Sequence, residues 1–107
     1  MMTTKERRQR ERVRADLEAH WEGVLARRDG RIVDISSSGC FILTTDEVRE
    51  EELIRLEIQL PTGRRIYLWG EVVYKVEEMG FALRFTGSDE TELQMLGVLI
   101  DYARGGG

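Results

Sequence analysis

Strict alternation of apolar and polar residues is the feature of this sequence that most limits its fold. Between residues 13 and 21 every second side chain is apolar: Val13, Ala15, Leu17, Ala19 and Trp21. A period of two is typical of a half-buried β-strand. Val13, Leu17 and Trp21 also lie four apart, as on one face of a helix. Ala15 and Ala19 fit only the alternation, so we predict a strand.

Five later segments continue the β pattern: residues 31–35, 40–44, 54–60, 66–76 and 81–85. Three of them have long apolar sets predicted to face inward: Ile54, Leu56, Ile58 and Leu60; Ile66, Leu68, Gly70, Val72, Tyr74 and Val76; Phe81, Leu83 and Phe85. A glycine inside a long strand is typical of a bend or bulge, and we expect one at Gly70.

Turn chemistry separates these segments. Glycine and polar residues predict turns at Gly23, at residues 27–30, at residues 36–39 and at residues 61–63, the last with the only proline. The acidic residues 46–52 are expected to form a short helical turn.

The period changes near the end of the chain. Ser88 is a candidate helix cap, with Asp89 and Glu90 in the first turn, where the helix dipole favours negative charge. Apolar residues then recur at helical spacing: Leu93, Leu96, Ile100 and Ala103. We therefore predict a mainly β fold, a small barrel or sandwich of six antiparallel strands with a C-terminal α-helix across an open end. The expected divisions are a flexible basic arm (1–12), the barrel and helix (13–104) and a disordered tail (105–107).

Composition excludes several classes of protein. No apolar run approaches the roughly 20 residues that span a bilayer, and the first residues do not form a secretory signal. One cysteine and one histidine cannot make an internal disulfide or a zinc site, so we expect a cytoplasmic protein without metal. His20 falls on the polar face of a strand, and Cys40 is predicted to be a small buried filler. We therefore expect no enzymatic activity.

The charge is unevenly distributed. The net charge is −4, but residues 1–14 have six basic and two acidic side chains, which gives +4 and leaves −8 for the rest. A basic arm on an acidic body indicates a segment that meets an anion, although a solvated terminus that aids solubility explains the charge equally well.

Two short motifs give the strongest functional signal. Arg7 precedes Arg8-Gln9-Arg10-Glu11-Arg12, and Asp34-Ile35-Ser36-Ser37-Ser38-Gly39 lies between the predicted second and third strands. In this order, and with this number of strands, the chain resembles the bacterial PilZ domain from Arg7 to about Ala103. Residues 70–74 and 79–85 are similar to the penultimate and last strands of that family.

The resemblance implies a receptor for cyclic di-GMP, with no other cofactor. Arg8 and Arg12, with Arg7 as an accessory, would bind guanine edges or phosphates, since an arginine fork fits both. Asp34 would accept hydrogen bonds from guanine, and Ser36 would bond to a base or phosphate. Gly39 would allow a positive φ or a close approach of the ligand. We expect Val33 and Ile35 to point into the core and so to turn Asp34 and Ser36 outward.

The same resemblance implies that the arm changes conformation on binding and signals to a partner protein. Tyr67, Trp69 and Val73 are predicted to face outward and to form an interface for that partner or for a homodimer. Two alternatives remain: a small-barrel nucleic-acid-binding protein, disfavoured by the acidic body, and a PilZ-like interaction module that does not bind nucleotide.

Overall fold

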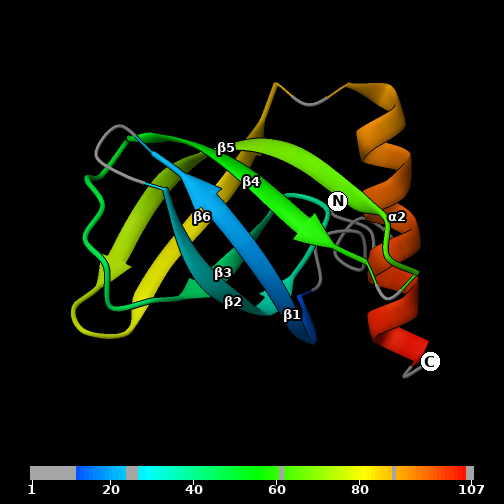
Figure 1. Ribbon diagram of the computed structural model, residues 1–107, viewed down its shortest axis with the longest axis horizontal. Helices are drawn as coiled ribbons and strands as arrows, with labels where there is room; N and C mark the ends of the chain where they lie inside the picture. The colour runs from blue at the N-terminus through cyan, green and yellow to red at the C-terminus, as the bar shows by residue number, and fades with distance from the viewer. Residues whose placement is uncertain (1–11, 24–26, 61, 88, 106–107) are drawn as a thin grey trace, which may run out of the picture.

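The computed structural model describes residues 12–23, 27–60, 62–87 and 89–105, and within them it shows a closed antiparallel β-barrel and one helix (Figure 1). The elements are β1 (Val13–Glu22), β2 (Arg27–Ile35), β3 (Gly39–Leu43), β4 (Leu53–Gln59), β5 (Arg65–Val76), β6 (Gly80–Thr86) and α2 (Glu90–Gly105). The strand order around the barrel is β1-β2-β3-β6-β5-β4. Pairing of β1 with β4 closes the sheet, so the predicted barrel is confirmed and the sandwich is not formed.

The alternating residues build the core. Leu17, Ala19 and Trp21 of β1 are buried, and so are three apolar residues of β4: Ile54, Leu56 and Ile58. Trp21 meets Phe81 edge to face, with ring centroids 5.3 Å apart. The period of two therefore predicted β1 correctly, and the helical alternative for this segment is wrong.

The predicted turn at residues 27–30 is wrong, because these residues begin β2 and pair with the end of β1. Gly30 is needed there for space, since a Cβ atom would lie 2.7 Å from Cγ2 of Ile42. Glycine in this strand therefore allows close packing against β3 and does not mark a change of direction.

The irregularity in β5 lies beyond Gly70. Gly70 pairs regularly with Ile54 and Phe85, and a Cβ atom on it would lie 2.5 Å from Cγ of Leu83. The register with β6 shifts between Val72 and Tyr74. This bulge reverses the facing of the residues that follow, so Tyr74 and Val76 are exposed and the prediction that they point inward is wrong.

The connections at the barrel ends differ in length, and the longest one joins β3 to β4 over residues 44–52. Residues 46–52 are not helical, so the expected helical turn is not formed. They contain one tight turn, in which the amide of Glu52 donates to the carbonyl of Arg49 at 3.1 Å. Gly63 has a φ of 92°, consistent with the turn expected around it, while Pro61 lies outside the described residues.

Helix α2 covers one end of the barrel, next to β1 and β5 (Figure 1). Asp89 caps it: its Oδ1 accepts from the amide of Glu92 at 2.8 Å, and Glu92 Oε1 accepts in return from the amide of Asp89. Ser88, the expected cap, lies outside the described residues. The buried stripe is Leu96, Leu99 and Ile100, whereas Leu93, predicted to be part of it, is exposed.

No helix among the described residues is long and apolar enough to cross a membrane.

Candidate functional site

The structure brings together one residue from each of the two motifs. Arg12 lies just before β1 and Asp34 lies near the end of β2, where Arg14 and Asp34 are cross-strand neighbours. Nη1 of Arg12 is 2.6 Å from Oδ1 of Asp34, and the two side chains are 46% and 32% exposed. The ion pair is therefore partly open to solvent. Arg7 and Arg8 lie outside the described residues.

A bulge determines how Asp34 faces. The register of β2 with β3 shifts between Ile32 and Asp34, and the register with β1 shifts in the same region. Ile32 and Ile35 are fully buried, while Val33 is only half-buried and is not part of the core. The prediction that Val33 points into the core is wrong, because the bulge changes the spacing of inward residues from two to three. Asp34 still reaches the outer surface.

Ser36 is placed differently from the expectation. Its backbone amide donates to the carbonyl of Gly39 at 2.8 Å, which closes the loop between β2 and β3. Its hydroxyl lies 3.0 Å from Oγ of Ser38 and accepts from the amide of Ser38 at 3.2 Å. With 1% of its surface exposed, Ser36 does not face outward as predicted. Its hydroxyl stabilises the loop that follows Asp34.

Position 39 needs a glycine because the backbone of β6 passes close to it. A Cβ atom there would lie 2.1 Å from the carbonyl oxygen of Leu83, and Gly39 does not have a positive φ. The close approach is therefore made by the backbone of β6, with Phe85 N donating to Ser38 O at 2.8 Å. This contact fixes the position of the loop relative to β6.

Cys40 is fully buried beneath the site, as the sequence predicted. Burial raises the pKa of its thiol well above the ordinary range; the charge of Asp34 adds to this effect and that of Arg12 opposes it. A thiol held neutral in this way is a poor nucleophile.

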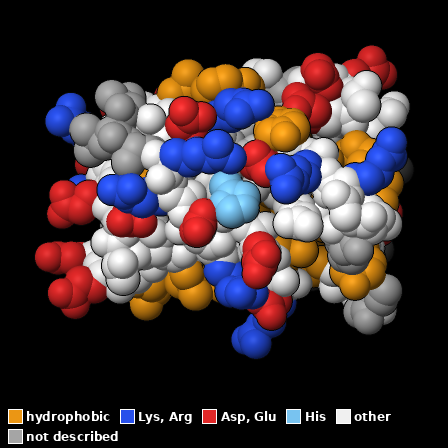
Figure 2. Space-filling view, viewed as in Figure 1, with side chains coloured by type: hydrophobic (Ala, Val, Ile, Leu, Met, Phe, Trp, Pro, Cys, Tyr) orange, Lys and Arg blue, Asp and Glu red, His pale blue; other side chains and the backbone are white. Residues whose placement is uncertain are grey.

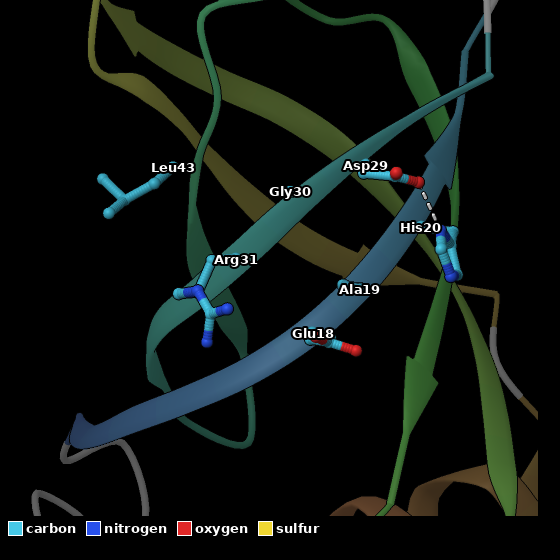
Figure 3. Close-up of a pocket in the computed structure, with 7 residues that line it drawn as sticks. All are labelled: Glu18, Ala19, His20, Asp29, Gly30, Arg31 and Leu43. Carbon is cyan, nitrogen blue, oxygen red and sulfur yellow. Dashed lines mark hydrogen bonds and ion pairs between the residues drawn. The ribbon is translucent and has the colours of Figure 1, made fainter.

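His20 lies on the outer face of the barrel, also as predicted. Its Nδ1 is 2.5 Å from Oδ1 of Asp29. Figure 3 shows this pair at the edge of a shallow hollow of about 370 Å³, with Glu18 and Arg31 nearby. Figure 2 shows the same face, with basic and acidic side chains around the histidine. Among the described residues, no group of three or more His, Cys, Asp or Glu side chains could hold a metal ion.

A row of side chains leads away from Asp34 across the outside of the barrel. Successive cross-strand pairs join Asp34 to Phe41, Phe41 to Ala82 and Ala82 to Tyr74. The rings of Phe41 and Tyr74 have centroids 6.3 Å apart, above the small Ala82. The sequence does not predict this row, because its alternation pattern places Tyr74 on the inner face. Phe41 follows the buried Cys40, so the same pattern does predict that Phe41 faces outward.

The predicted interface residues divide into two groups. Trp69 is 40% exposed on the outer face of β5, and Tyr67 is half-buried beneath Arg55, whose Cζ lies 4.5 Å from the ring centroid. Val73 is exposed, but it lies at the bulge. All three are at least partly accessible, and their role as an interface stays a prediction.

Similarity to known proteins identifies the family of this chain. The sequence matches the PilZ domain family model over residues 6–102. The chain belongs to the PilZ domain family. No curated protein of similar sequence was found.

Solved PilZ-type structures share this fold. The PilZ domain of CeSA from a cellulose-synthesizing bacterium superposes with a TM-score of 0.71 at 13% identity, over 85% of this chain and 95% of that one. The inhibitor of motility MotI (DgrA) of Bacillus subtilis gives 0.72 at 21% identity, over 89% and 48%. MrkH of K. pneumonia in its apo state gives 0.67 at 17% identity, over 100% and 56%. The chain thus spans about half the length of the last two proteins.

PilZ domains are typically binding or adaptor modules. This agrees with the geometry around Asp34, which offers hydrogen-bonding groups, charge and aromatic surface at the outer face of the barrel.

Proposed function

We propose that this PilZ domain binds cyclic di-GMP at Arg12 and Asp34 and transmits the binding event to a partner protein. The observation that supports the proposal most directly is the solvent-exposed Arg12–Asp34 ion pair, which joins the end of the arginine motif to the start of the Asp-x-Ser-x-x-Gly motif. An acceptor for a guanine edge and a donor fork for a phosphate or a guanine therefore lie side by side.

The ion pair is easily rearranged. Exposed pairs contribute about 0–1 kcal/mol to stability, so a ligand can displace or share either partner at little cost. A carboxylate accepts several hydrogen bonds on two oxygens, and Arg12 occupies one of them. Asp34 can then accept from the N1 and N2 donors of guanine while Arg12 turns to a phosphate or to the guanine O6 and N7 atoms.

Arg7 and Arg8 complete the proposed site. Cyclic di-GMP has two phosphates, and residues 1–14 have a net charge of +4. Their guanidinium groups can pair bidentately with phosphate or stack on a base. Contacts of this kind would order the arm against the barrel, and the rearranged arm would be the signal that a partner reads.

The aromatic row offers a place for a base. Phe41 is next to Asp34 across the strands, and Tyr74 lies beyond Ala82. Base–aromatic stacking contributes about 1–3 kcal/mol per base. Ser36 supports the site indirectly, through the loop hydrogen bonds that place Asp34 and Gly39.

Calorimetric titration of cyclic di-GMP against the purified chain tests the proposal. We expect saturable binding that Arg8→Ala and Arg12→Ala each weaken by roughly tenfold to a hundredfold, because each removes a charged, bidentate contact. Arg31→Ala is the matched control, since Arg31 also pairs with an aspartate, Asp16, on the outer surface. Absence of binding to the unaltered chain would contradict the proposal and leave the nucleotide-independent interaction module as the better explanation.

A further inference from the structure

A second surface of the barrel has the composition of a docking site. Four neighbouring large apolar side chains on the outside of β3 and β5 and in the turn between β5 and β6 are between 38% and 51% exposed: Leu43, Tyr74, Val76 and Met79. With the half-buried Phe41 they form a patch, which we call the β6 patch. Apolar patches bordered by charge are typical of protein interaction sites.

The register explains why the patch is continuous. Gly80 of β6 pairs with Leu43 on one side and with Val76 on the other, and Ala82 pairs in the same way with Phe41 and Tyr74. Cross-strand neighbours share a face of the sheet, so two rungs of large side chains flank a central strand with small ones. The bulge after Val72 creates this surface, because it turns Tyr74 and Val76 outward.

Close packing between β6 and β3 also requires a small residue at position 80. A Cβ atom on Gly80 would lie 1.9 Å from the carbonyl oxygen of Ile42, so no larger residue can fill the space between Leu43 and Val76 without moving β3.

A hollow of about 580 Å³ opens beside the patch, at the barrel end opposite α2. It lies between residues 44–48 and residues 75–78, and Val76 belongs to both the hollow and the patch. Four carboxylates line it: Asp46, Glu47, Glu77 and Glu78. The single lysine of its lining, Lys75, is held by the carbonyl of Val48, to which its Nζ donates at 3.2 Å.

The charge of the hollow is poorly balanced. Asp46 is paired with Arg28 at 3.3 Å. Within the described part of the chain, Glu47, Glu77 and Glu78 have no ion-pair partner. The surroundings of the patch therefore favour a cation.

We propose that the β6 patch and the adjoining hollow dock a segment of a partner protein in which aliphatic side chains alternate with lysine or arginine. The aliphatic side chains would cover Leu43, Val76 and Met79, and a long cationic side chain would enter the hollow toward Glu47 and Glu77. Charge complementarity sets the sign, because an acidic segment would meet three carboxylates that have no ion-pair partner among the described residues. Phe41 and Tyr74 are shared with the proposed nucleotide site, but Leu43, Val76, Met79 and the hollow are not, so docking of the segment does not require nucleotide binding.

NMR titration with two model peptides tests this docking surface. One is a short amphipathic peptide of leucine and lysine, and the other replaces every lysine by glutamate. We expect the lysine peptide to shift the backbone amide signals of Leu43, Val76 and Met79, and the glutamate peptide to leave them unchanged. Two double variants, Val76→Thr with Met79→Ser and Glu47→Lys with Glu77→Lys, should each weaken binding at least tenfold. All four positions are exposed, and thermal unfolding verifies that each variant is folded.

Val98→Thr with Glu90→Lys is the matched control, since it removes an exposed valine and reverses a glutamate on α2. This variant should bind the lysine peptide as well as the unaltered chain does. The inference is overturned if the lysine peptide does not bind, if both peptides bind equally, or if the shifted signals lie outside the β6 patch. It is equally overturned if the patch variants bind like the control.

Discussion

Asp34 is the residue at which the proposed function is most sharply testable. Replacement by asparagine keeps the shape of the side chain but exchanges one acceptor oxygen for a donor amide and removes the charge. We expect Asp34→Asn to weaken cyclic di-GMP binding by roughly tenfold to a hundredfold, the effect of losing a good base contact. Stability should change by less than about 1 kcal/mol, because the pair with Arg12 is exposed. Calorimetry and thermal unfolding measure the two effects.

Asp16→Asn provides the comparison for this variant. It removes a carboxylate that is likewise paired with an arginine, Arg31, on the outer surface. Nucleotide affinity should be unchanged in Asp16→Asn; an equal loss in both variants would show that general surface charge, and not a guanine contact, is responsible.

Gly39 tests a structural requirement. In Gly39→Ala the new Cβ atom would meet the backbone of β6, which cannot rotate away as a side chain can. We expect a loss of about 1–3 kcal/mol in the free energy of unfolding, the usual cost of overpacking, measured by urea denaturation. Gly97→Ala is the contrasting change: the space around Gly97 is open and the residue is helical, so stability should rise by roughly 0.5–1 kcal/mol. Equal stabilities in the two variants would contradict the close approach of β6.

At the scale of elements, the face of α2 that packs against the barrel differs in part from the face predicted from the sequence. Leu99 is 1% exposed, while Leu93 is 48% exposed. Leu99→Ala should therefore destabilise the protein by about 2–5 kcal/mol, as expected for a buried leucine, and Leu93→Ala should change stability by no more than about 0.5 kcal/mol. Denaturant unfolding of both variants measures the difference. The opposite ranking would mean that the helix packs with the face predicted from sequence.

The alternation pattern predicted the barrel strands well and failed at the bulges. It located β1 and β4 almost to the residue, because β4 pairs regularly with β5, and β1 pairs regularly from Leu17 onward, which keeps every second side chain on one face. It misplaced Val33 and Tyr74, since each lies at or next to a bulge in a strand paired on both sides. A bulge is decided by how neighbouring strands fit together around the barrel, and a single strand does not contain that information.

The same limit applies to the candidate site. The motifs predicted Arg12 and Asp34 as site residues from side-chain chemistry that is local to each residue, and the structure places the two side chains together. The burial of Ser36 was not predictable, because it arises from hydrogen bonds that form only once the loop closes. The juxtaposition of Phe41 and Tyr74 depends on β6 lying between their strands, an arrangement set by the topology of the whole barrel.

At the scale of the molecule, charge is divided unevenly along the sequence. Residues 1–14 have a charge of +4 while the rest of the chain has −8, so we expect cyclic di-GMP, the proposed ligand, to be repelled by the body and attracted by the N-terminal segment. Complementary charge near a site increases the association rate, and salt suppresses the effect. Lys5 and Arg10 are basic residues to which no contact with the ligand is assigned, so they should act mainly on the rate of encounter.

Two double variants with the same net charge test this directly. Lys5→Ser with Arg10→Ser removes two charges from the N-terminal segment, and Arg28→Ser with Arg49→Ser removes two from the end of the barrel away from Asp34; each lowers the net charge from −4 to −6. In stopped-flow measurements at low salt, we expect the first variant to bind cyclic di-GMP roughly two- to tenfold more slowly, with an unchanged dissociation rate. The second variant should bind nearly as fast as the unaltered chain, and the difference should vanish at high salt, where the Debye length falls to about 3 Å. Equal slowing in both variants would show that total charge governs encounter and that the position of the basic segment has no part in it.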